Sequence, residues 1–81
     1  MDLFRKKRII TVESIEKGID GIRNYGHSDP MLPTYLKSLA KDINSLNPSK
    51  EQKTAYKSRI LEEIEKTGNN SDTYKHCLSD L

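Results

Sequence analysis

The chain has 81 residues and a mass of 9.3 kDa; 33% of the residues are apolar, 32% are charged, and the formal net charge is +2. This length allows one small domain and excludes a Rossmann unit, a barrel or a deep catalytic cleft, because none of these closes in so short a chain. No apolar run approaches the roughly 20 residues that span a bilayer. Because the basic N-terminus leads into no long apolar stretch, we do not expect a signal peptide.

The single cysteine, Cys77, excludes an intrachain disulfide. Small secreted domains usually depend on several disulfides, so we expect a reducing, cytoplasmic setting in a bacterium or a virus. The near balance of 14 basic and 12 acidic residues permits a nucleic-acid partner but does not require one.

The first predicted helix spans residues 12–25. Thr11 can cap its start, and Gly26 is expected to end it in a left-handed conformation. Gly18 and Gly21 each weaken it by about 1 kcal/mol relative to alanine. We interpret these glycines as marks of a marginal helix, with close backbone packing as the alternative. Apolar residues recur at steps of three and four along one face: Val12, Ile15, Ile19, Ile22 and Tyr25.

The second predicted helix spans residues 30–46. Asp29 before Pro30 is typical of an N-cap followed by proline at the first helical position, and Pro33 still fits the first turn. The helix therefore starts between Asp29 and Pro33, and Asn47-Pro48 ends it. Its apolar residues form the clearest stripe in the chain, with the spacing of a packing seam: Leu32, Leu36, Leu39, Ile43 and Leu46.

The third predicted helix spans residues 50–66. Ser49 and Gln52 fit a capping box at its start, and Thr67-Gly68 supplies the stop. After a loop in which Ser71 can act as a cap, residues 72–80 have the spacing of a short fourth helix that would be unstable unless packed. One face of the third helix carries Tyr56, Ile60 and Ile64, with Ala55 and Leu61 beside it; the C-terminal segment carries Tyr74, Cys77, Leu78 and Leu81.

These patterns predict an all-α fold: a small three-helix bundle with up-down connections and room for a short C-terminal fourth helix. We expect a basic N-terminal arm over residues 1–10 and a single helical domain over residues 11–81.

The pattern predicts no catalytic, cofactor or metal site. His27 and His76 are dispersed, and adjacent helical side chains such as His76 and Cys77 do not converge on one point. The acidic residues near Arg59 are expected to form a solvated face, because paired-carboxylate catalysis needs a cleft. We therefore expect that the protein is not an enzyme. Those acidic residues are Glu62, Glu63 and Glu65.

The most polarised stretch is the basic run of the N-terminal arm. Three interpretations compete: a charged leader that aids solubility, an arm that touches phosphates, and, least favoured, contact with an anionic membrane surface. The four residues are Arg5, Lys6, Lys7 and Arg8.

A nucleic-acid-binding regulator is the main alternative class, using this arm and the lysines of the second helix. The order of the first two helices is similar to a helix-turn-helix, but residues 27–33 are longer than its usual three- or four-residue turn and contain two prolines. The second helix also displays no arginine for guanine.

Residues at the margins of the apolar stripes indicate a protein interface, because tyrosine and methionine are enriched there. The alternative is that they only complete the core. The candidate partner-binding residues are Met31, Tyr35, Tyr56, Leu61, Tyr74 and Leu78.

An Ile-x-x-Ile helix, a glycine, a leucine-striped helix and then a helix with the string Tyr56-Lys-Ser-Arg-Ile-Leu-Glu62 follow one another over about Ile15 to Lys66. This order resembles the small enteric biofilm and acid-stress regulators of the AriR connector type. The resemblance implies a short all-helical signalling connector that could bind DNA. It consists of helix spacing and one string, and Pro30 and Pro33 depart from the pattern, so no residue roles are carried over. The bulk properties equally fit bacteriocin-immunity proteins and phage accessory proteins.

The function expected from the sequence is a non-catalytic regulatory protein. It would bind another protein, or a second copy of itself, through an exposed apolar edge of the bundle, and would thereby modulate or inhibit that partner. No cofactor is expected.

Overall fold

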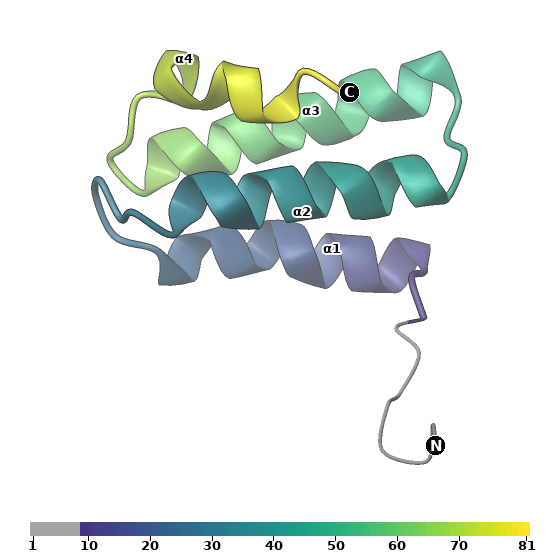
Figure 1. Ribbon diagram of the computed structural model, residues 1–81, viewed down its shortest axis with the longest axis horizontal. Coiled ribbons are helices and arrows are strands. Elements are labelled where there is room, and N and C mark those ends of the chain that lie inside the picture. Colours follow the sequence, from purple (N-terminus) through teal and green to yellow (C-terminus); the bar gives the residue numbers. More distant parts are fainter. Residues whose placement is uncertain (1–8) are drawn as a thin grey trace.

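The computed structural model describes residues 9–81 and confirms the all-α fold, with no strand in that part of the chain (Figure 1). Its elements in chain order are α1 (Val12–Asp20), the 3-10 helix η2 (Gly21–Asn24), α2 (Leu32–Ser45), α3 (Lys50–Lys66), α4 (Ser71–Tyr74) and the 3-10 helix η3 (Lys75–Leu78).

Successive segments run in alternate directions, so the connections are up-down, as expected (Figure 1). α1 packs against both α2 and α3. The C-terminal segment closes the other side, where η3 packs on α2 and α4 packs on α3. The short fourth segment is therefore packed against the bundle.

A single buried cluster lies between these segments. Every helical segment contributes to it, so the core depends on all of them at once. Its members are Ile15, Ile19, Ile22, Leu32, Leu36, Leu39, Ala40, Ile43, Ile60, Ile64, Tyr74, Cys77 and Leu78.

The first helical segment is less regular than predicted. The α-helix stops at Asp20 and continues as one 3-10 turn to Asn24. Gly26 does not have the expected left-handed conformation; the positive φ in this loop belongs to Ser28, at 59°. The capping prediction at Thr11 is confirmed, because its side chain accepts from the amide of Ser14, whose hydroxyl accepts from the amide of Thr11.

The second helix begins at Leu32, inside the interval predicted for its start, Asp29 to Pro33. Asp29 does not cap the helix; its carboxylate accepts from the Met31 amide at 2.9 Å and shapes the turn that precedes it. Pro33 lies in the first turn, where it removes no helical hydrogen bond. The helix ends before Asn47, which has a φ of 49°.

The bounds of the third helix match the prediction. Ser49 and Gln52 form both bonds of the capping box, at 3.2 and 2.9 Å, and Gly68 ends the helix with a φ of 86°. The cap of α4 is Asn70, whose side chain accepts from the Asp72 amide, and not Ser71 as predicted.

Within residues 9–81, no helix combines the length and the apolar character that crossing a membrane requires.

Candidate functional site

The two glycines of the first segment lie beside side chains of α2. A Cβ atom at Gly18 would stand 2.8 Å from Leu39 Cδ1, and one at Gly21 would overlap the Tyr35 hydroxyl. Real Cβ contacts are not this short, so a side chain at either position would require Leu39 or Tyr35 to shift. The two glycines therefore make room for these α2 side chains.

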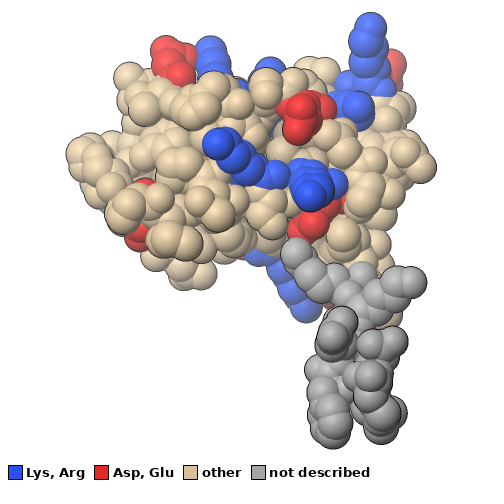
Figure 2. All heavy atoms as spheres, in the orientation of Figure 1, with Lys and Arg blue, Asp and Glu red and all other residues tan. Residues whose placement is uncertain are grey.

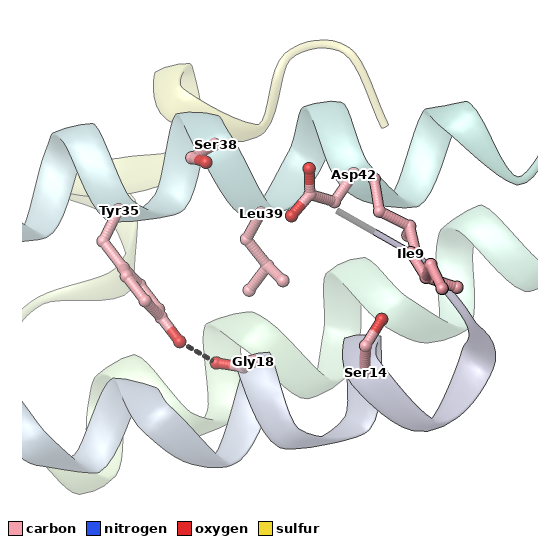
Figure 3. A pocket seen from close by; sticks show the side chains of 8 residues that line it. Ile9, Ser14, Gly18, Tyr35, Ser38, Leu39 and Asp42 are labelled. Carbon is pink, nitrogen blue, oxygen red and sulfur yellow. Dashed lines mark hydrogen bonds between the residues drawn. The ribbon is translucent and has the colours of Figure 1, made fainter. Parts of the chain in front are cut away.

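A groove of about 210 Å³ lies beside this contact, between α1 and α2 (Figure 3). Tyr35 bounds one end of the groove, and its hydroxyl donates to the Gly18 carbonyl at 2.5 Å. Leu39 lies between Tyr35 and Asp42 along α2, while Ile9 and Ser14 lie at the opposite end from Tyr35 (Figure 3). The lining residues are Ile9, Ile10, Ser14, Gly18, Tyr35, Ser38, Leu39 and Asp42.

The Tyr35 ring is held firmly. It packs against the Tyr25 ring, with centroids 4.8 Å apart and planes tilted by 42°. Burial raises the pKa of the Tyr35 hydroxyl above its ordinary value, with the nearby Tyr25 as a smaller cause. The hydroxyl therefore stays protonated at neutral pH and acts as a hydrogen-bond donor to α1.

The chemistry of the groove suits contact more than turnover. Its walls combine aliphatic side chains and two serine hydroxyls with a single carboxylate, Asp42. Among the residues that the structure describes, no group of three or more histidine, cysteine, aspartate or glutamate side chains is placed to hold a metal ion.

The predicted partner-binding residues do not share one exposed edge. Tyr74 is 8% exposed and Leu78 is 0% exposed, so the expectation that these two lie at an open margin is wrong: the docked C-terminal segment buries them. Met31, at 58%, is the only member of this set that is exposed. Tyr35, Tyr56 and Leu61 are partly buried and pack against the core.

Two strongly exposed apolar residues were not predicted from the sequence. Ile9 is 82% exposed and Val12 is 59% exposed. Ile9 and Ile10 are two adjacent isoleucines directly after the basic run, and this pair was the only sign in the sequence of an apolar contact there. The sequence does not show that Ile10 packs against the core while Ile9 remains in solvent. The residues of the basic run itself, Arg5, Lys6, Lys7 and Arg8, lie outside the described residues.

The acidic run on α3 is not simply a solvated face. Glu63 is buried and accepts from Arg23 Nε at 2.6 Å, with Lys66 at 3.2 Å from its other oxygen. Arg59 pairs across to Glu16 on α1. The pairs made by Arg23 and Arg59 join α3 to the first segment. Within the run only Glu63 is buried, whereas Glu62 and Glu65 are exposed as expected.

The structure brings His76 and Cys77 into contact, so the expectation that these adjacent side chains do not converge is wrong, whereas His27 belongs to the loop before α2. His27 and His76 are exposed, whereas Cys77 is buried. Cys77 Sγ lies 3.5 Å from His76 Nε2, and burial raises the pKa of the thiol, so the reactive thiolate is disfavoured.

The first two helices do not form a helix-turn-helix. They run antiparallel and side by side (Figure 1), whereas that motif crosses its helices steeply.

No known protein family matches this chain, and no match is found among curated proteins or solved structures. A proposal for its function therefore depends on the geometry of the groove and of the surface around it.

Proposed function

We propose that this protein is a non-catalytic binding protein that recognises another protein through the groove between α1 and α2 and thereby modulates or inhibits it. The observation that carries the proposal is the position of Ile9, which is 82% exposed and lines the groove together with buried Leu39 and half-buried Ile10. A large aliphatic side chain exposed to water at the end of a groove with mixed apolar and polar walls gains free energy when a partner covers it, at about 25 cal/mol per Å².

The size of the groove supports a protein side chain as the occupant. Pockets for small molecules usually measure about 300–1,000 Å³, whereas this one measures about 210 Å³. One or two apolar side chains from a partner would fill it. Interfaces are commonly anchored in this way, by a few side chains that enter pockets at the centre of the contact.

The walls of the groove are rigid enough to select an occupant. Tyr35 is held by its hydrogen bond to Gly18 and by the Tyr25 ring, and Leu39 is 5% exposed. A preformed groove loses little conformational entropy on binding. The partner would be inhibited by occlusion, because the segment that enters the groove is no longer accessible to others.

The sharpest test blocks the groove without touching the core. Ser38 is exposed, lines the groove and lies on α2, so Ser38→Trp places a bulky ring at the mouth. Thr34 is also exposed, lies one turn earlier on α2 and does not line the groove, so Thr34→Trp is the matched control.

The tagged full-length variants would be used to co-purify partners from the native host, and light scattering would measure self-association. We expect the wild type and Thr34→Trp to recover the same protein, or to form the same dimer, and Ser38→Trp to lose it. A partner that Ser38→Trp still retains at wild-type yield would refute the groove as the binding site.

A further inference from the structure

The positive charges of the described residues fall into two groups that differ in their partners. Five cations form ion pairs with nearby carboxylates: Lys17, Arg23, Arg59, Lys66 and Lys75. Five lysines have no carboxylate within ion-pair distance in residues 9–81: Lys37, Lys41, Lys50, Lys53 and Lys57.

The unpaired lysines are concentrated in one stretch of the chain, α2 and the first half of α3. Residues 32–57 contain five lysines and only two acidic residues, Asp42 and Glu51. The next fifteen residues, 58–72, reverse this balance, with four acidic residues and two basic ones. The charges of a chain with a net charge of only +2 are therefore unevenly distributed along its sequence.

The fold places these lysines along two helical stripes. Lys37 and Lys41 are one turn apart on α2, and Lys50, Lys53 and Lys57 follow one another at steps of three and four on α3. Figure 2 shows basic side chains over α2 and over the beginning of α3 on one face of the molecule, with acidic side chains between them. Lys37, Lys41 and Lys50 are exposed, and Lys53 and Lys57 are partly buried.

We propose that this lysine face, formed by Lys37, Lys41, Lys50, Lys53 and Lys57, binds the phosphate backbone of double-stranded nucleic acid without regard to sequence. This is a second interaction, separate from the α1/α2 groove. Unpaired lysines attract phosphates and release the counterions that surround them. The face has no arginine, which is the usual residue for bidentate contacts to guanine, so it provides no means of reading bases.

Two other partners fit the face less well. Contact with a membrane surface requires large apolar side chains beside the charges, but the strongly exposed ones among the described residues are Ile9, Val12 and Met31, none of which lies on these stripes. Protein interfaces favour tyrosine, tryptophan and arginine over lysine, and lysine supplies all the positive charge of this face.

The test measures binding of the full chain to a fluorescently labelled 20-base-pair DNA duplex by anisotropy at several salt concentrations. With about four phosphate contacts, we expect the affinity to fall about 100-fold between about 50 and 200 mM salt. Lys37→Gln with Lys41→Gln should weaken binding about tenfold and reduce the slope of log affinity against log salt by about 2.

The matched control is Lys17→Gln with Lys75→Gln, which removes the same charge from two exposed lysines that are already ion-paired. We expect the control to bind within about threefold of the wild type, and circular dichroism should show that both variants remain folded. If the two double variants lose affinity equally, or if the salt slope does not change, the lysine face is not the binding site.

Two further measurements complete the test. The first shows whether DNA binds to the lysine face or to the N-terminal arm, and the second shows whether the partner is DNA or an acidic protein. In a variant in which Arg5, Lys6, Lys7 and Arg8 are all replaced by glutamine, adding Lys37→Gln and Lys41→Gln should still weaken DNA binding about tenfold. If replacing the four arm residues alone abolishes all salt-dependent binding, the proposal is wrong.

The second measurement compares binding to DNA with binding to a polyglutamate peptide at the same salt concentration. If the peptide binds as tightly as DNA, the partner of the lysine face is an acidic protein and not nucleic acid. The Ser38→Trp variant should bind DNA as tightly as the wild type. The proposal that the groove binds a protein and the proposal that the lysine face binds DNA can therefore fail independently.

Discussion

Arg23 Nε donates a hydrogen bond of 2.6 Å to Glu63 Oε1, although the two residues are 40 positions apart in the chain. The contact joins η2 to the last turns of α3, and Lys66 reaches the other carboxylate oxygen at 3.2 Å. The Glu63 side chain is 9% exposed, whereas that of Arg23 is 60% exposed. The buried charge is therefore neutralised by a partner at the surface.

This contact predicts a loss of stability in acid. The hydrogen bond from Arg23 is the largest cause that holds the pKa of Glu63 below its ordinary value; Lys66 helps and burial opposes. A carboxylate with a lowered folded pKa stabilises the fold above its unfolded pKa, and this stabilisation is lost as the pH falls through the folded pKa. Between about pH 5 and about pH 3, we expect the unfolding free energy of Glu63→Gln to decline less than that of the wild type.

The same variant should be less stable at neutral pH, by roughly 1–2 kcal/mol, because hydrogen bonds to a charged group are lost. Glu62→Gln is the control: Glu62 is exposed and its oxygen lies 3.7 Å from Lys66 Nζ, so the change should cost less than about 0.5 kcal/mol. Urea denaturation across the pH range measures both effects. Parallel pH profiles for the wild type and Glu63→Gln would contradict the prediction.

The close approach at Gly21 predicts that a methyl group there is harmful. In Gly21→Ala the new Cβ meets the Tyr35 hydroxyl, so the ring must shift and weaken its bond to Gly18. We expect a destabilisation of roughly 1–2 kcal/mol, despite the better helix propensity of alanine.

Gly26→Ala is the control for this change, because nothing lies within 4 Å of a Cβ at Gly26 and its φ is not positive. Its unfolding free energy should stay within about 0.5 kcal/mol of the wild type. If chemical denaturation finds Gly21→Ala as stable as Gly26→Ala, the glycine does not serve close packing.

Because Ser49 forms a capping box, its hydroxyl should contribute measurably to the stability of the protein. Ser49→Ala removes the acceptor for the Gln52 amide and should destabilise the protein by about 1 kcal/mol. Ser58→Ala, at an exposed position inside α3, should be neutral or slightly stabilising, because alanine is the better helix former. Thermal unfolding of the two variants gives the comparison, and equal midpoints would rule out a capping role.

Because the C-terminal segment is buried against the core, truncating its buried side chains should lower the free energy of unfolding. Leu78 is fully buried, so Leu78→Ala should destabilise the protein by about 2–4 kcal/mol, whereas partly buried Leu81→Ala should cost less. The thiol of Cys77 reports the same event, because a thiol reagent reaches it only when this segment opens. Labelling of Cys77 should be slow in the wild type and faster in Leu78→Ala. Rapid labelling of the wild type would show that the segment is not docked.

The helices can be predicted from the amino-acid sequence because their signals are local. The capping residues Thr11 and Ser49 bond to amides three positions away, and Gly68 supplies a left-handed stop that other residues adopt rarely. The stripe of α2 is local in the same sense, since its spacing follows from the pitch of one helix. The end of α1 near Gly21 was less predictable, because contact with Tyr35 competes there with the intrinsic conformational preference of the chain. The start of α2 after Asp29 was less predictable, because the Asp29 side chain bonds to the Met31 amide in a turn before the helix.

Which apolar and charged side chains remain in solvent depends instead on how the helices assemble. Periodicity could not distinguish Leu78, which the bundle buries, from Ile9, which it leaves exposed. The groove between α1 and α2 and the contact between Arg23 and Glu63 likewise join residues far apart in the chain. Such contacts depend on how separate helices dock, and docking is determined by the shapes of many side chains together and not by any short stretch of sequence.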